Sequence, residues 1–106
     1  MLGDVQVRIA KQSFTKDDAG TLALKALGFL ASDEARITRF LRLTGLEPEQ
    51  LRAQAGEAET LIAVLDHLMG DQSLLLVFAA EEGVKPERIE TARALLSGVN
   101  NPGVWL

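Results

Sequence analysis

ALKALGFLASDEARITRFLRLTGLEPEQL, residues 23–51, aligns without a gap on LIAVLDHLMGDQSLLLVFAAEEGVKPERI, residues 61–89. The shift of 38 positions brings together seven identical pairs: Leu27/Leu65, Leu30/Leu68, Asp33/Asp71, Phe40/Phe78, Gly45/Gly83, Pro48/Pro86 and Glu49/Glu87. A match at one fixed period is typical of a supersecondary unit used twice. We therefore predict that the chain contains a tandem repeat.

Each copy has the pattern of three short helices separated by caps and turns. Ser32 and Asp71 are candidate N-caps, Gly45 and Gly83 follow helices, and a proline opens the third helix of each copy. Apolar residues recur between these signals with helical spacing. The pattern predicts six helices, at about residues 16–31, 33–44, 48–55, 58–69, 72–82 and 86–97.

We expect an all-α fold, a compact bundle of about six short helices built from this tandem three-helix repeat. Each half has an apolar face that it cannot bury alone, so the halves should pack face to face about a pseudo-two-fold axis. Residues 1–106 are expected to form a single helical domain.

The two ends depart from the helical pattern. In the arm, residues 1–13, Val5, Val7 and Ile9 alternate with less apolar residues as in a strand. The arm therefore either pairs with a second copy of the chain or is mobile. The tail, residues 99–106, contains Trp105, which is costly to leave in water. We expect the tail to pack on the core.

Composition excludes several classes of protein. The chain has no cysteine, which rules out disulfides, a thiol nucleophile and a cysteine metal site. Its net charge of −4 disfavours binding to nucleic acid and to anionic lipid. Its longest apolar run, residues 74–80, falls far short of the roughly 20 residues that cross a bilayer, and no signal peptide is evident. We expect a soluble, cytoplasmic protein without membrane contact.

Four segments carry a family resemblance: residues 26–30, residues 39–48, residues 64–66 and residues 74–79. Together they resemble a family of small helical proteins from α-proteobacteria that is classed as a domain of unknown function. The resemblance covers about Phe14 to Ser97 and rests on caps, turns and core positions. It implies a bacterial, cytoplasmic, all-α protein, and it brings no activity or functional residues with it.

The residues give little support for catalysis. His67 is the single histidine, and although Asp66 and Asp71 lie near it in sequence, no second histidine or cysteine can complete a site. In the repeat His67 aligns with Phe29, which indicates a partly packed structural position. We predict that the protein is not an enzyme and uses no cofactor or metal.

A helix-turn-helix is the alternative function. Ala79, Gly83, Val84 and Ile89 match the small, turn and core positions of that motif. The helix that would read DNA, however, begins with Pro86, Glu87, Arg88, Ile89 and Glu90, and its acids would face phosphates. We therefore regard a DNA-binding regulator as the second choice.

The two copies differ most in their second helix. Arg36, Arg39 and Arg42 form a basic stripe, whereas their partners in the second copy are Leu74, Val77 and Ala80. A helix that is apolar on every side must be covered on every side. We expect residues 72–82 to be the central helix of the bundle, and the alternative is a protein interface.

The function that we expect is a non-enzymatic protein-interaction module, whose partner is a protein or a second copy in a homodimer. A small-molecule pocket between the halves is a third option. The predicted partner surface consists of Arg36, Arg39, Arg42, Leu74, Val77 and Trp105.

Overall fold

Six α-helices account for most of residues 13–98, the part of the chain that this computed structural model describes. They are α2 (Lys16–Ala31), α3 (Glu34–Thr44), α4 (Pro48–Gln54), α5 (Ala58–Met69), α6 (Gln72–Glu82) and α7 (Pro86–Ser97). No strand occurs among these residues, so the predicted all-α bundle of six short helices is confirmed. The strand pattern of the arm and the Trp105 tail lie outside the described residues.

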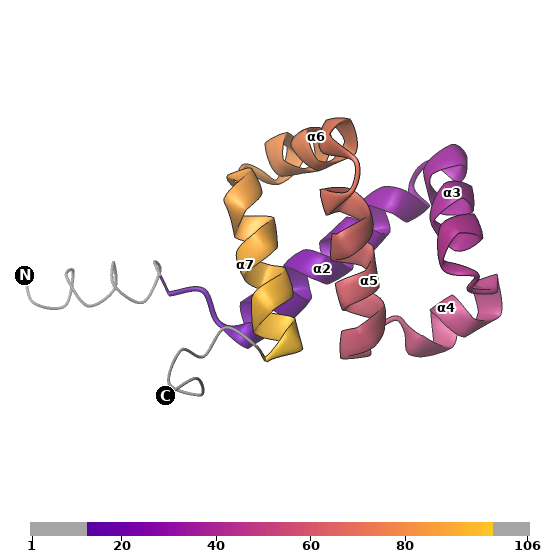
Figure 1. Ribbon diagram of the computed structural model, residues 1–106, viewed down its shortest axis with the longest axis horizontal. Helices are drawn as coiled ribbons and strands as arrows, with labels where there is room; N and C mark the ends of the chain where they lie inside the picture. Colours follow the sequence, from indigo (N-terminus) through magenta and orange to yellow (C-terminus); the bar gives the residue numbers. More distant parts are fainter. Residues whose placement is uncertain (1–12, 99–106) are drawn as a thin grey trace, which may run out of the picture.

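Three helices form the centre of the molecule. α2, α5 and α7 pack on one another, with α2 running behind the other two in Figure 1. α3 and α4 lie to one side, and α6 lies across the ends of α5 and α7. The largest fully buried side chains are apolar and come from both halves of the chain: Leu30, Phe40, Val64, Leu65, Leu68, Phe78 and Ile89.

Short polar residues fix where the helices begin and end. Thr15 and Asp18 form a capping box at the start of α2, each side chain accepting a hydrogen bond from the other's backbone N–H. Asp33 and Asp71 cap α3 and α6 through one bond each, accepting from the backbone N–H of Arg36 and Leu74 at 3.1 and 3.2 Å. The predicted cap Ser32 is wrong, because its hydroxyl donates to the Phe29 carbonyl and its backbone closes α2.

Left-handed glycines end the second helix of each copy. Gly45 follows α3 with φ of 78° and Gly83 follows α6 with φ of 69°. A side chain at either position would strain the backbone, since L-residues rarely adopt positive φ. Pro48 and Pro86 then open α4 and α7, as the sequence predicts.

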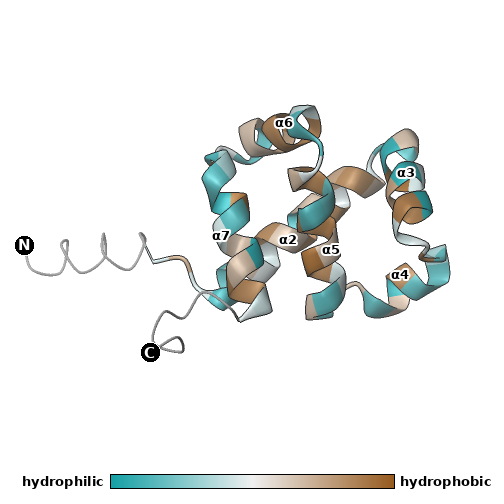
Figure 2. Ribbon diagram, viewed as in Figure 1, coloured by the Kyte–Doolittle hydropathy of each residue, from teal (hydrophilic) through white to brown (hydrophobic). Residues whose placement is uncertain are grey.

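The prediction that residues 72–82 form the central helix is wrong. α6 is bent by 110° from α5 and buries only two residues, Phe78 and Ala79. Leu76 and Val77 are exposed by 47% and 43%. The hydropathy colouring shows this apolar helix at the edge of the bundle (Figure 2). The central places go to α2, α5 and α7, which pack on one another.

Two aromatic contacts join the halves of the chain. Phe29 on α2 lies 5.3 Å from Phe78 on α6, measured between ring centroids. His67 on α5 lies 5.3 Å from Phe40 on α3 in an edge-on arrangement. The 38-residue shift relates Phe29 to His67 and Phe40 to Phe78. Each contact therefore joins the same two repeat positions, with the two copies exchanged. The prediction that Phe40 and Phe78 both lie in the core is confirmed.

The repeat itself stays a prediction. The bounds of α3 and α6 coincide under the shift, and α2 and α5 end at equivalent residues. The third helices differ, because α4 ends at Gln54 after one buried residue whereas α7 continues to Ser97 and packs into the centre. The face-to-face arrangement of the halves also stays a prediction.

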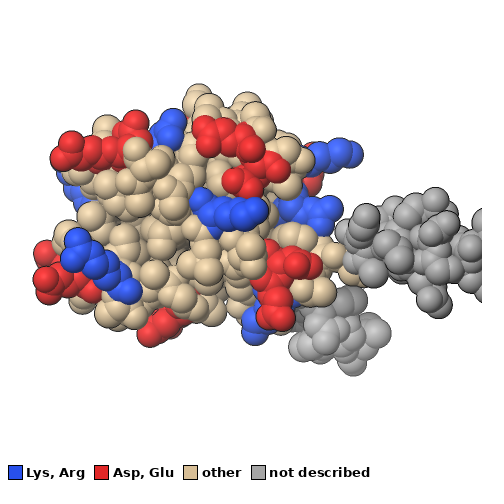
Figure 3. All heavy atoms as spheres, turned by 180° about the vertical axis from the view of Figure 1, so that it is seen from behind, with Lys and Arg blue, Asp and Glu red and all other residues tan. Residues whose placement is uncertain are grey.

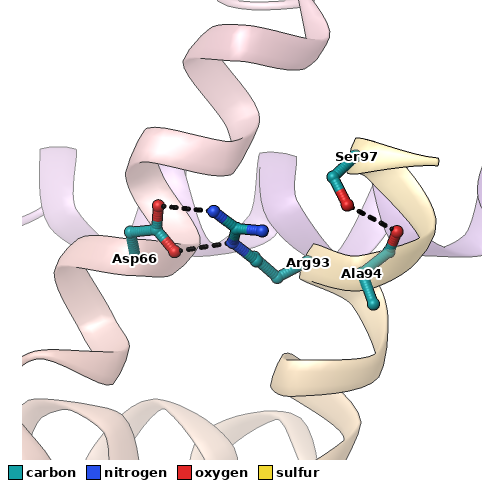
Figure 4. Close-up of polar contacts among 4 residues, drawn as sticks. All are labelled: Asp66, Arg93, Ala94 and Ser97. Carbon is teal, nitrogen blue, oxygen red and sulfur yellow. Dashed lines mark hydrogen bonds and ion pairs between the residues drawn. The ribbon is translucent and has the colours of Figure 1, made fainter. Parts of the chain in front are cut away.

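One ion pair ties α5 to α7. The Arg93 guanidinium donates to both carboxylate oxygens of Asp66, at 2.9 and 3.4 Å (Figure 4). The hydrogen bond to Asp66 raises the pKa of Arg93, and both side chains remain accessible to water. On the same helix the Ser97 hydroxyl donates to the Ala94 carbonyl at 2.8 Å, which holds the last turn of α7 (Figure 4). An exposed pair of this kind orients helices more than it stabilises them.

No single helix within residues 13–98 has both the length and the apolar character needed to cross a membrane. α5 and α6 pass that test only when they are taken together, and they are bent at the break between them.

Candidate interaction surface

The three arginines of α3 have different environments. Arg36 is half-buried, and its guanidinium carbon lies 4.2 Å from the centroid of the Phe29 ring, a cation–π contact. Arg39 and Arg42 are exposed, and no ion pair within residues 13–98 holds either of them. The predicted basic stripe is therefore split: Arg36 covers the core, and the other two are available to a partner.

An exposed leucine lies beside the two available arginines. Leu43 is 64% exposed and follows Arg39 by four residues, so both lie on the same face of α3. Arg39 and Arg42 also line a shallow depression with Glu34, Ala35 and Thr38. We call Arg39, Arg42 and Leu43 the α3 outer face. Leu43 was not among the residues predicted for the partner surface. Its spacing from Arg39 and its position away from the buried side of the helix could have indicated that it is exposed.

The predicted apolar contributors from α6 also separate. Leu74 is half-buried and packs against the core, so it is not available to a partner. Val77 is exposed, and Leu76 beside it, which the predicted surface left out, is exposed to a similar extent. Trp105 lies outside the described residues. The described residues of the predicted surface lie on two helices, α3 and α6, and the surface as a whole stays a prediction.

His67 occupies the packed position that the repeat alignment indicates. Its ring contacts Phe40, and its Nε2 atom is buried without a hydrogen-bond partner. Burial lowers the pKa of His67, the nearby charge of Arg39 lowers it further, and Asp71 opposes both effects. The ring contact and the buried nitrogen are those of a packed side chain, and the absence of catalysis stays a prediction. Within residues 13–98, no group of three or more His, Asp or Glu side chains is placed to hold a metal ion.

The α6–turn–α7 pair has the connectivity of a helix-turn-helix, and DNA binding stays the alternative prediction. α7 buries Ile89, Ala92 and Leu96 among the central helices, and Arg88 lies over the Phe14 ring at 4.5 Å. The outward residues near its start include Glu87 and Glu90. On the face seen in Figure 3, acidic and basic side chains are interspersed and form no continuous basic area.

An open hollow lies between the start of α2 and the turn before α7. It has a volume of about 560 Å³ and is lined by Phe14, Leu22, Val84, Arg88 and Thr91 among others. The guanidinium of Arg88 is already engaged by Phe14. Lys85 and Glu87 also line the hollow, and binding of a small molecule stays a prediction.

The family model described as a protein of unknown function, DUF3572, matches residues 16–99. The chain belongs to this family. The match begins at the first residue of α2 and ends just after α7, so the DUF3572 unit is the six-helix body. The resemblance to a domain of unknown function is confirmed, whereas the α-proteobacterial origin stays a prediction.

No curated protein and no solved structure matched the chain. Membership of DUF3572 brings no activity and no functional residue, so a function for this chain has to be argued from its own surface.

Proposed function

We propose that this DUF3572 protein is a small, non-enzymatic protein-interaction module that binds an acidic segment of a partner protein through the α3 outer face. The observation that carries the proposal is the exposure of Leu43 beside two arginines that no acid of residues 13–98 pairs with. Arginine is enriched at protein interfaces, and an exposed leucine beside it can lose its contact with water when a partner binds.

The chemistry of the α3 outer face specifies its partner. Arg39 and Arg42 are three residues apart, just under one helical turn, and each guanidinium group can form two parallel hydrogen bonds with a carboxylate. Leu43 offers an apolar contact next to them. A partner segment with two acidic residues and a neighbouring large apolar residue meets all three side chains. Such a partner would bind more weakly as salt is added, because the exposed charges are screened.

Charge reversal tests the proposal. The double variant Arg39→Glu/Arg42→Glu should lose binding to acidic, leucine-containing peptides and retain its fold, since exposed charges contribute little to stability. Arg52→Glu is the matched control, because Arg52 is an exposed arginine on the neighbouring helix α4. Fluorescence anisotropy with labelled acidic peptides, with sequence-matched basic peptides and with random duplex DNA measures the three affinities.

The outcomes separate the proposed function from its alternative. Salt-dependent binding of the acidic peptides that the double variant loses and Arg52→Glu keeps would support the interaction module. Leu43→Ser should reduce the same binding without changing its salt dependence. Tight duplex binding at physiological salt that the double variant abolishes would overturn the proposal in favour of a DNA-binding regulator. Equal binding by the double variant and the control would also overturn it.

A further inference from the structure

The outward side of α6 is a second surface, separate from the α3 outer face. It consists of Leu76, Val77, Ala80 and Glu81, all of them exposed, and we call it the α6 outer face. Two of the four large apolar side chains that are exposed within residues 13–98 lie here. Ala80 lies three and four positions from Val77 and Leu76, and Glu81 lies four from Val77, so these neighbours on the helix surface form a continuous patch.

The fold does not require this surface to be apolar. The 38-residue shift places Leu76 and Val77 at the positions of Thr38 and Arg39 on α3, a helix with the same bounds within its copy. α3 carries polar side chains there and forms equally well. Folding of a single chain therefore does not explain the apolar residues on this side of α6. An uncovered apolar patch is typical of a docking surface.

The charges of α6 run against its own dipole. Each of the other five helices within the described residues carries an acid in its first turn, whereas α6 carries none there and has Glu81 and Glu82 in its last turn. Acids are favourable at a helix N-terminus and unfavourable at a C-terminus. Glu82 is paired with Lys25 at 3.5 Å, but no ion pair among residues 13–98 holds Glu81.

We propose that a second copy of the chain docks on the α6 outer face, so that two α6 helices pack antiparallel about a two-fold axis near Val77. In that arrangement position 81 of one copy lies opposite position 73 of the other. Each Glu81 then faces the N-terminal end of the partner helix, where the dipole is positive and Asp71 accepts only one of the free N–H groups. The apolar centres meet each other, as an interface between identical patches requires.

The size of the surface predicts a weak dimer. The 11 residues of α6 span about 16 Å, so one helix face buries less than the roughly 1,200 Å² of a stable interface. We expect a dissociation constant on the order of micromolar or weaker, with monomer and dimer in rapid exchange. The α3 outer face lies on another helix and stays free in this dimer, so the two proposals can fail independently.

Sedimentation of the full chain over a wide concentration range tests the dimer. The average mass of the wild-type chain should rise from the monomer value of 11.5 kDa toward twice that value. Val77→Asp should remain monomeric at every concentration, with unchanged circular dichroism and melting. Arg39→Asp is the matched control, because it places the same acid at the equivalent position of α3 and should dimerise as the wild type does.

Two further variants keep the test decisive if Val77→Asp fails to fold. Glu81→Lys should weaken dimerisation measurably, because it replaces the favourable charge at the partner's helix end. The chain has no cysteine, so Val77→Cys introduces a single thiol beside the proposed axis. It should form a disulfide-linked dimer on mild oxidation much faster than Arg39→Cys does. A monomeric wild-type chain at all concentrations, or equal oxidation rates for the two cysteine variants, would overturn the proposal.

Discussion

Replacing His67 with phenylalanine should stabilise the protein, and more so in acid. The Nε2 atom of His67 is buried without a partner, and an unsatisfied buried polar atom costs about 1–3 kcal/mol. The ring is only half-buried, so we take the lower end, about 1 kcal/mol. Phenylalanine and histidine have similar helix propensities, so this contribution cancels. The equivalent residue Phe29 already packs on Phe78 at the same centroid separation as His67 on Phe40.

The dependence on pH follows from the lowered pKa of His67. Burial and Arg39 hold that pKa below the ordinary value of 6.5, so the unfolded chain takes up the proton first as pH falls. The stability that neutral His67 contributes is therefore present above pH 6.5 and is lost as pH falls through the folded value. The difference in free energy of unfolding between the wild type and His67→Phe should therefore increase as the pH falls from 6.5 through the pKa of folded His67.

Thermal unfolding by circular dichroism at about pH 8 and about pH 5 measures both effects. At the higher pH a gain of about 1 kcal/mol corresponds to a rise of roughly 4–8 °C in melting temperature for a domain of this size. His67→Gln separates the two causes, since it removes the titration but keeps polar atoms in the site. Equal pH dependence in the wild type and His67→Phe, or a lower melting temperature for His67→Phe at the higher pH, would refute the reasoning.

Four further substitutions test the packing, the backbone and the surface, each by urea denaturation. Phe78→Ala should cost about 3–5 kcal/mol, because the ring is fully buried; a loss far smaller would contradict its place in the core. Gly28→Ala should gain up to about 1 kcal/mol inside α2, where an added Cβ meets nothing within 4 Å, whereas Gly83→Ala should lose about 1–2 kcal/mol because its φ is 69°. Arg93→Ala should leave the midpoint nearly unchanged, since its pair with Asp66 is exposed; a large shift would show that this pair does hold α7 on α5.

The helices could be predicted closely because local chemistry fixes their ends. Aspartate at 71, glycine at 83 and proline at 86 each act on the backbone within a few residues, so their effect can be read from the sequence. Ser32 and Asp33 show the limit of this reasoning. Either of these adjacent residues could cap α3, but Ser32 ends α2 and Asp33 is therefore the cap.

The place of α6 could not be predicted because composition does not say which neighbour covers which side. Apolar residues occur on all sides of residues 72–82, so the sequence does not show which side is buried. The bend after Met69 decides which of these sides face the core. The predicted partner surface and the proposed α3 outer face overlap only in part for the same reason. Arg36 and Leu74 turn inward through contacts with distant residues, which no spacing along one helix reveals.

The crossed aromatic pairs bear on how the chain is made. Phe29 finds its partner only when residue 78 is present, and Phe40 finds its partner only when residue 67 is present. During synthesis the first three helices therefore leave the ribosome before the ring partners of Phe29 and Phe40 have been made. We expect the interior that α2 and α3 share with α5 and α6 to form only after the second half has emerged, so that folding involves both halves.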